Sequence, residues 1–111
     1  MRAGRLRHMG TIERPVVTKD GAGGIVTAWE PAFGGSSDVW VAIEPLTGTQ
    51  YFAAKQVMSE VTHRLTMRYL SGVLPSMRLT FSGRHFAFVS VINPDERNRD
   101  LVIMATEVVS P

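Results

Sequence analysis

Apolar and polar residues alternate along much of the chain, most regularly in EVTHRLTMRY, residues 60–69. Side chains two residues apart in a strand point to the same face, so this period of two predicts a strand with unlike faces. We expect one face to fill the core and the other to face outward. The inward set is Val61, His63, Leu65, Met67 and Tyr69, and the outward set is Thr62, Arg64, Thr66 and Arg68.

Further segments along the chain have the composition and flanking turns of strands. They are residues 9–17, 25–33, 38–46, 77–81, 84–92 and 99–109. Turn-forming sequences such as KDGAGG (19–24) and NPDERN (93–98) separate them. Short strands at this spacing, without helices between them, indicate an antiparallel barrel or sandwich. We predict a mainly β chain that forms a small antiparallel β-barrel of six to seven strands, because closure removes exposed strand edges.

One segment, TQYFAAKQVM at residues 49–58, interrupts the alternation. Its alanines, lysine and glutamine are good helix formers, and Tyr51, Ala54 and Met58 would share one helical stripe. We therefore predict one short α-helix of two to three turns, held to the barrel by its aromatic residues. GGSS, residues 34–37, predicts a mobile loop.

Length and composition limit the class of protein to which the chain can belong. The chain has 111 residues, of which 44% are hydrophobic and 20% charged, so we expect a single globular domain over residues 1–111. It contains no cysteine, which excludes disulfides and thiolate chemistry. No apolar run is long enough to cross a bilayer and no signal-peptide pattern is present, so we expect no membrane association.

The formal net charge of +2 is too small to indicate a dedicated nucleic-acid binder, but its distribution is uneven. Arg2, Arg5, Arg7 and His8 crowd the first eight residues. We interpret residues 1–8 as a flexible basic arm that a partner orders.

No residues have the spacing of a catalytic, cofactor or metal site. His8, His63 and His85 lack a second ligand at i+2 or i+4, and no serine lies in a nucleophile motif. GAGG, residues 21–24, precedes a strand rather than a helix, which indicates a hairpin tip and not a phosphate loop. We interpret His63 as a histidine at the barrel mouth bonded to a backbone carbonyl, and we predict no enzymatic activity, no cofactor and no metal.

The arginines of the outward strand face leave three interpretations open. Arg64 and Arg68 share that face, and Arg78 and Arg84 are expected nearby. The face could be an ordinary solvated surface, or its arginines could pair with acids of a neighbouring subunit. A third interpretation is a single-stranded nucleic-acid-binding barrel, which combines such charge with exposed aromatic side chains.

A cluster of carboxylates near the end of the chain has two interpretations. Asp95, Glu96 and Asp100 lie in a turn that also holds Arg97 and Arg99. The first interpretation is a solvated loop that neutralises its own charge, and the second is a docking loop for a partner protein.

Several stretches of the chain resemble one known family. The opening combines MRAGRLRH with TIERPV, a glycine-rich turn and Trp29. VWVAIEPLTGTQYFAAKQVMSEVTHRLTMRY follows at residues 39–69, and RLTFSGRHFAFVSVINPDERNRDLVI at residues 78–103. In these stretches, and over nearly the whole chain, the sequence resembles the head–tail joining proteins of phages with long, non-contractile tails, a family of head-closure and head–tail adaptor proteins.

This resemblance implies a small β-barrel with a short helix and a mobile loop, and a structural role at the virion neck. Members form a ring beneath the portal and its adaptor, which closes the head after DNA packaging and gives the tail its docking surface. The implied partners are other copies of the chain, the portal or adaptor protein, the tail terminator protein, and packaged DNA near a channel loop. Assembly would occur in the bacterial cytoplasm, from a chain that can be monomeric in isolation. The alternative is another ring component of the neck or tail.

Four surfaces are expected to contact these partners: the basic arm, the outward strand face, the glycine loop and the acidic turn. Their residues are Arg2, Arg5, Arg7, Arg64, Arg68, Gly34, Gly35, Asp95 and Glu96.

Overall fold

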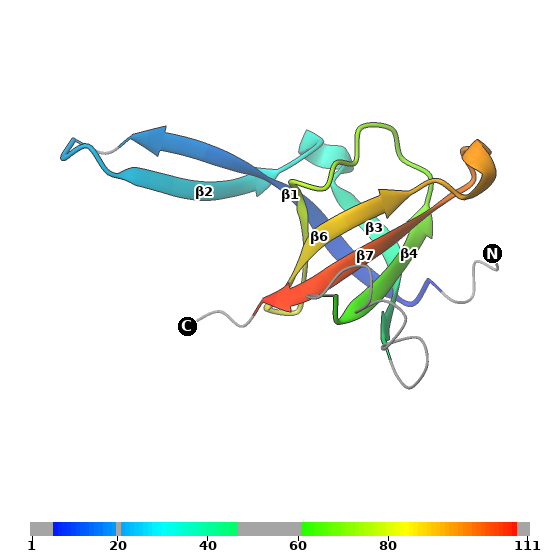
Figure 1. Cartoon of the computed structure of the whole chain (residues 1–111). Helices are drawn as coiled ribbons and strands as arrows, with labels where there is room; N and C mark the ends of the chain where they lie inside the picture. The colour runs from blue at the N-terminus through cyan, green and yellow to red at the C-terminus, as the bar shows by residue number, and fades with distance from the viewer. Residues whose placement is uncertain (1–5, 20, 47–60, 109–111) are drawn as a thin grey trace.

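The computed structural model describes residues 6–19, 21–46 and 61–108, and these form seven strands and two short 3-10 turns (Figure 1). The strands are β1 (His8–Lys19), β2 (Ile25–Pro31), β3 (Asp38–Pro45), β4 (His63–Arg68), β5 (Arg78–Phe81), β6 (Arg84–Ile92) and β7 (Asp100–Val108). The 3-10 turns are η2 (Gly34–Ser36) and η3 (Pro94–Glu96). The predicted strand segments are confirmed to within a few residues, whereas the helix predicted over 49–58 lies outside the described residues.

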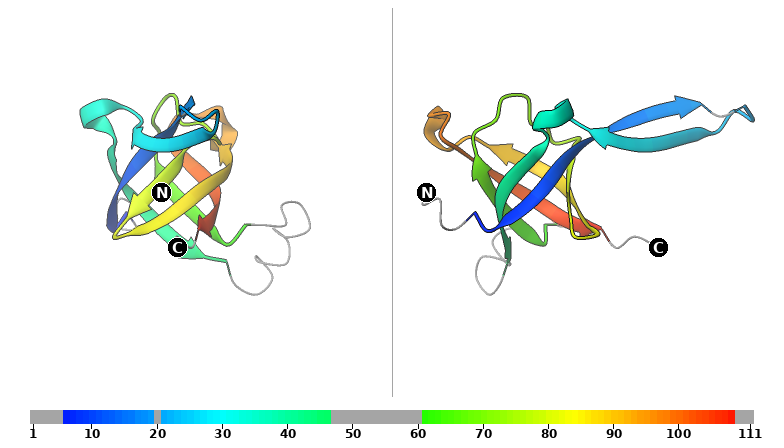
Figure 2. Two further views of the ribbon diagram at one scale, coloured as in Figure 1. Left: turned by 90° about the vertical axis from the view of Figure 1, so that its left-hand side faces the viewer. Right: turned by 180° about the vertical axis from the view of Figure 1, so that it is seen from behind.

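The sheet closes into a barrel, as predicted. Its order is β2-β1-β3-β4-β7-β6-β5, every pairing is antiparallel, and an additional pairing of β1 with β5 joins the two sides. Six strands thus form the barrel and β2 pairs with β1 outside it (Figure 2, left). The closure excludes the sandwich alternative.

β1 is long because its first part belongs to the barrel and its second part forms a hairpin with β2. Its first residues pair with β3, from His8 to Thr11, and with β5, from Thr11 to Glu13. From Glu13 to Lys19 it pairs with β2. The hairpin of β1 and β2 therefore leaves the barrel at Glu13 and projects to one side of it (Figures 1 and 2), which gives the molecule extents of 48 × 33 × 27 Å. The turn sequence KDGAGG predicted the hairpin but not its projection.

The barrel interior holds one hydrophobic core from all six barrel strands. Its fully buried members include Ile12, Val41, Leu65, Leu79, Phe86 and Ile103. The inward prediction for Val61, Leu65 and Met67 is confirmed. In β6 the register shifts between Phe88 and Ser90, so the residues that pack inward change from Phe86 and Phe88 to Val91.

Two residues around β4 differ from the predicted faces. Thr66 was predicted to face outward, yet it is buried. It lies directly opposite Ala42, which is buried as well, and both side chains are small. Tyr69 was predicted to face inward but is 37% exposed, because β4 ends at Arg68 and the alternation ends with it.

Candidate interaction site

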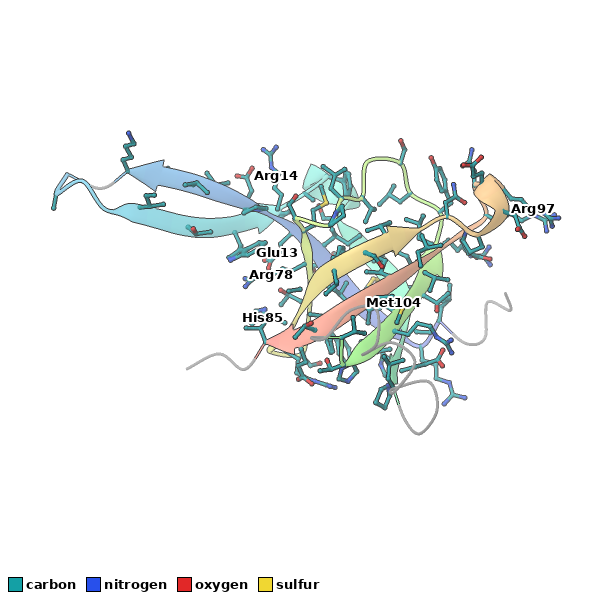
Figure 3. All side chains as sticks on the ribbon, viewed as in Figure 1. Glu13, Arg14, Arg78, His85, Arg97 and Met104 are labelled. Carbon is teal, nitrogen blue, oxygen red and sulfur yellow. The ribbon has the colours of Figure 1, made fainter. Side chains whose placement is uncertain are left out.

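A cluster of polar side chains fixes the hairpin to the barrel at its root. Glu13 accepts hydrogen bonds from Arg78 Nε at 2.8 Å and from Thr80 Oγ1 at 2.7 Å. The Arg78 guanidinium also lies 4.2 Å from the centre of the Trp29 ring on β2, a cation–π contact. The cluster therefore joins β1, β2 and β5, and Figure 3 shows Glu13, Arg78 and His85 together beneath the hairpin.

Hydrogen bonding sets the ionisation of this cluster. Burial raises the pKa of the Glu13 carboxyl, but the hydrogen bonds from Thr80 and Arg78 and the Arg78 charge outweigh it, so the pKa lies below its usual value. Thr80 Oγ1 also lies 2.9 Å from His85 Nδ1. Because the single hydroxyl proton of Thr80 goes to Glu13, the His85 Nδ1 must carry the proton of this second bond.

The projecting part of the hairpin exposes apolar side chains. Val17, on β1, is 62% exposed, and Ile25, on the neighbouring strand β2, is 71% exposed. The pairing of Val17 with Thr27 and of Lys19 with Ile25 puts Val17 and Ile25 on the same face. The two side chains form an exposed apolar pair on this face, beside Lys19, which lies opposite Ile25.

A second apolar surface lies where β1 begins. Leu6, Val39, Trp40, Met67 and Arg68 line a groove of about 330 Å³. The Trp40 side chain is 53% exposed, and Met9, which lies opposite it on β1, is also exposed. This groove and the hairpin tip thus lie at opposite ends of the same strand.

The mouth of the barrel carries a separate polar network around His63. The predicted backbone carbonyl partner is wrong: the Thr62 hydroxyl lies 2.9 Å from His63 Nδ1, and Glu107 Oε1 lies 3.9 Å from Nε2. Burial lowers the pKa of His63; Glu107 raises it, and the charge of Arg84 lowers it further. The imidazole is therefore best described as neutral, with Phe86 against its ring at 5.1 Å.

The order Thr62, His63, Glu107 superficially matches a hydroxyl nucleophile, a base and an orienting acid. The contacts do not support that role. Glu107 accepts two hydrogen bonds from Arg84, at 2.8 and 3.0 Å, which lower the pKa of its carboxyl. The Thr62 oxygen in turn accepts the backbone N–H of Glu107 at 2.8 Å. These bonds close the β4, β6 and β7 ends of the barrel, which is a structural role.

The structure separates the arginines that were expected to form one face. Arg64 bonds Glu44 on β3 at 3.0 Å, Arg78 bonds Glu13, and Arg84 bonds Glu107. Each of these charges is therefore matched by a carboxylate of the same chain. Arg68 alone among the four borders the apolar groove, which the sequence did not indicate.

The other predicted contact residues lie at scattered places. Arg7 is exposed beside the groove, whereas Arg2 and Arg5 lie outside the described residues. Gly34 and Gly35 are exposed in η2. Asp95 and Glu96 are exposed in η3 with positive φ, in a turn that an Asn93–Asn98 side-chain bond of 2.8 Å closes. This turn lies near Arg97, at the end of the barrel away from the hairpin (Figure 3).

Neither apolar surface was recognised from the sequence, although a signal for the hairpin existed. Val16 and Val17 are consecutive in β1, and Ile25 and Val26 are consecutive in β2. The consecutive Val16 and Val17 place one apolar side chain on each face of β1, whereas a strand between solvent and core needs a single apolar face. The groove joins residues from three distant segments, so local patterns could not reveal it.

Two further properties concern the described residues only. No three His, Asp or Glu side chains come together there as a metal site. In the same residues, no helix has the length and apolarity that crossing a membrane requires.

These features define a closed antiparallel barrel whose distinctive surfaces are suited to contacts with other chains. The profile of the phage head completion protein family matches residues 1–108. The chain belongs to this family, which makes it a structural protein associated with the virion and with completion of the phage head.

Comparison with solved structures gives the same fold. The solution structure of protein SF1141 from Shigella flexneri 2a is 24% identical, with a TM-score of 0.70 and coverage of 100% of both chains. A chain of the virion of a native gene transfer agent particle is 21% identical, with a TM-score of 0.59, over 94% of this chain and 96% of that one. No curated protein has significant similarity to the chain.

Proposed function

We propose that the chain forms a ring at the virion neck, between the portal with its adaptor and the tail. In this role it closes the DNA-filled head and provides the surface to which the tail docks. The observation that carries the proposal is the match to the phage head completion family over residues 1–108. The likeness to a chain of a gene transfer agent virion supports it, because that neighbour is itself part of a particle.

The architecture supports an assembly role in physical terms. A ring requires two different surfaces on each subunit that bind each other head to tail. The chain has an apolar hairpin and an apolar groove at opposite ends of β1. The proposed partners are further copies of the chain, the portal or adaptor protein, the tail terminator protein, and packaged DNA where a loop reaches the channel. The role is non-enzymatic, and assembly occurs in the host cytoplasm.

The single-stranded nucleic-acid alternative loses its main support. Arg64, Arg78 and Arg84 each bond a carboxylate of the same chain, so they do not form a free cationic track. Among the described residues, the most exposed aromatic residue, Trp40, lies in an apolar groove.

Electron microscopy of particles from a genome that lacks this gene tests the proposal. Tailless heads beside complete free tails are the expected result, and empty heads among them would add DNA retention to the role. A plasmid copy of the wild-type gene should restore joined particles. Normal joined particles in the absence of the gene would overturn the proposal.

A further inference from the structure

Among the described residues, no element covers the apolar side chains of the projecting hairpin. A two-stranded ribbon by itself is marginally stable in water. Val17 and Ile25 nevertheless expose 62% and 71% of their surface on one face of this ribbon. Beyond Glu13, the only described strand that pairs with β1 is β2. Covering these side chains would therefore stabilise the ribbon as well as the complex.

The root of the hairpin holds the ribbon in a fixed direction. Arg78 bonds Glu13 at 2.8 Å and covers the ring of Trp29, which lies on the same face as Ile25 and nearer the barrel. A surface element that is ordered before binding loses less conformational entropy when it binds. The hairpin is therefore built as a preformed projection.

The groove at the other end of β1 is mainly apolar. Its lining residues are Leu6, Val39, Trp40, Met67 and Arg68, and its volume of about 330 Å³ leaves room for aliphatic side chains. Exposed tryptophan in a concave apolar site is typical of the residues that dominate binding energy at protein interfaces.

We propose that the hairpin of one copy, through Val17 and Ile25, docks in the Trp40 groove of the next copy. The inference rests on the proposed ring and names its subunit contact. β1 has 12 residues, so at about 3.3 Å per residue it spans about 40 Å from groove to hairpin tip. The tip of the hairpin and the first residues of β1 lie at opposite ends of this strand (Figures 1 and 2), and the groove is lined by Leu6, just before β1, so a hairpin cannot reach the groove of its own chain. Repetition of this contact is heterologous and can close a ring.

The chemistry of the hairpin favours this occupant over nucleic acid. Of its described basic residues, Arg14 pairs with Glu30 across the two strands, and Lys19 lies opposite Ile25 as a single exposed cation rather than a basic track. The exposed Val17 and Ile25 have neither charge nor an aromatic face for a base. The groove offers them the apolar surroundings that an aliphatic side chain gains most from entering.

Cysteine cross-linking in assembled particles tests the contact, because the chain has no cysteine of its own. We would combine Val17→Cys with Met9→Cys, at the rim of the groove, and treat purified particles with a short bismaleimide. The two positions are eight residues apart in one strand, a separation of about 26 Å. A short bismaleimide cannot span this distance, so it cannot join the two cysteines within one copy. The matched control replaces Val17→Cys with Leu74→Cys, which is also an exposed apolar position but lies in the turn before β5.

The expected result is a ladder of cross-linked oligomers that requires both cysteines and is missing from the control. If the chain is present at the neck but forms no ladder, the contact is overturned and the proposed function stands. The same conclusion follows if the cysteine at position 17 is cross-linked to a different protein. If the chain is absent from the particles, the proposed function is overturned and the contact with it.

A second comparison uses charge. Val17→Asp with Ile25→Asp should reduce incorporation into particles by about tenfold or more, since a buried unpaired carboxylate opposes docking. Leu74→Asp with Ile92→Asp, at similarly exposed positions of the barrel, should leave incorporation unchanged. Equal incorporation of both variants would contradict the proposed contact.

Discussion

Glu13 and Arg78 are 65 residues apart in the sequence, yet the Arg78 Nε–H donates to the Glu13 carboxylate at 2.8 Å. Glu13 is the residue where β1 passes from β5 to β2, because it pairs with Arg78 on one side and with Pro31 on the other. The same guanidinium covers Trp29. One ion pair thus sets the direction in which the hairpin leaves the barrel.

Loss of the Glu13 charge should destabilise the fold measurably. Glu13→Gln leaves a half-buried guanidinium without its carboxylate and should lower the free energy of unfolding by about 1–3 kcal/mol. Urea unfolding measures the change. The matched control is Glu30→Gln, whose partner Arg14 is exposed, and here the loss should stay below about 1 kcal/mol. Equal losses in the two variants would show that the root cluster has no special role.

Acid should reduce stability in two stages. Burial lowers the pKa of His63 below its usual 6.5, so the unfolded chain takes up this proton first and stability falls as the pH drops below about 6.5. The pKa of Glu13 lies below its usual 4.5, so its contribution is complete above about pH 4.5 and is lost as the pH falls through the lowered value. Melting temperatures across this range give the profile.

Two variants separate these stages. His63→Gln should flatten the profile near pH 6 and leave the acidic part, whereas Glu13→Gln should do the reverse. A wild-type melting temperature that increases between pH 7 and about 5 would contradict the assignment to a buried, neutral His63.

Charge on the N-terminal arm should matter for docking and not for folding. Replacing Arg2, Arg5 and Arg7 by alanine should leave the melting temperature unchanged and weaken co-purification with the portal complex. The same positions changed to lysine retain the charge and should restore docking if attraction to an acidic surface is responsible. Unchanged co-purification of the alanine variant would overturn the role of the arm.

Burial of the inward faces can be tested at the centre of the core. Leu65 is fully buried. Leu65→Asp or Phe88→Asp should prevent folding, so that no cooperative melt is observed, because each puts an unpaired charge in the core. The milder Leu65→Ala should cost about 2–5 kcal/mol. Leu74→Ala, at an exposed position, should stay within about 0.5 kcal/mol. A cooperative melt of Leu65→Asp at the wild-type temperature would refute the assigned faces.

Local patterns predicted the strands and most of their faces because alternation reports which side chains meet the core. They failed where burial depends on distant segments. Thr66 is buried where β4 lies between Ala42 of β3 and Val102 of β7, and the partner of Arg78 comes from a strand 65 residues away. The groove at Trp40 likewise needs Leu6 and Met67 beside it. Such sites arise from closure of the barrel, for which a single strand carries no signal.

Gly10 lies against Leu79 and Thr80 of β5, directly before the residues through which β1 pairs with that strand. A Cβ at this position would lie 2.7 Å from Leu79 Cδ1 and 3.2 Å from the Thr80 carbonyl oxygen. Leu79 is itself buried in the core, so it has little room to move away. Gly10→Ala should therefore lower the free energy of unfolding by about 1–3 kcal/mol, the usual cost of overpacking.

Gly21→Ala is the control for this substitution, because a Cβ there meets no atom within 4 Å. It should leave stability unchanged or raise it by up to about 1 kcal/mol, since alanine restricts the unfolded chain. Urea midpoints of the two variants measure the difference. If Gly10→Ala unfolds at the wild-type midpoint, β1 does not lie against β5 as closely as the barrel closure requires.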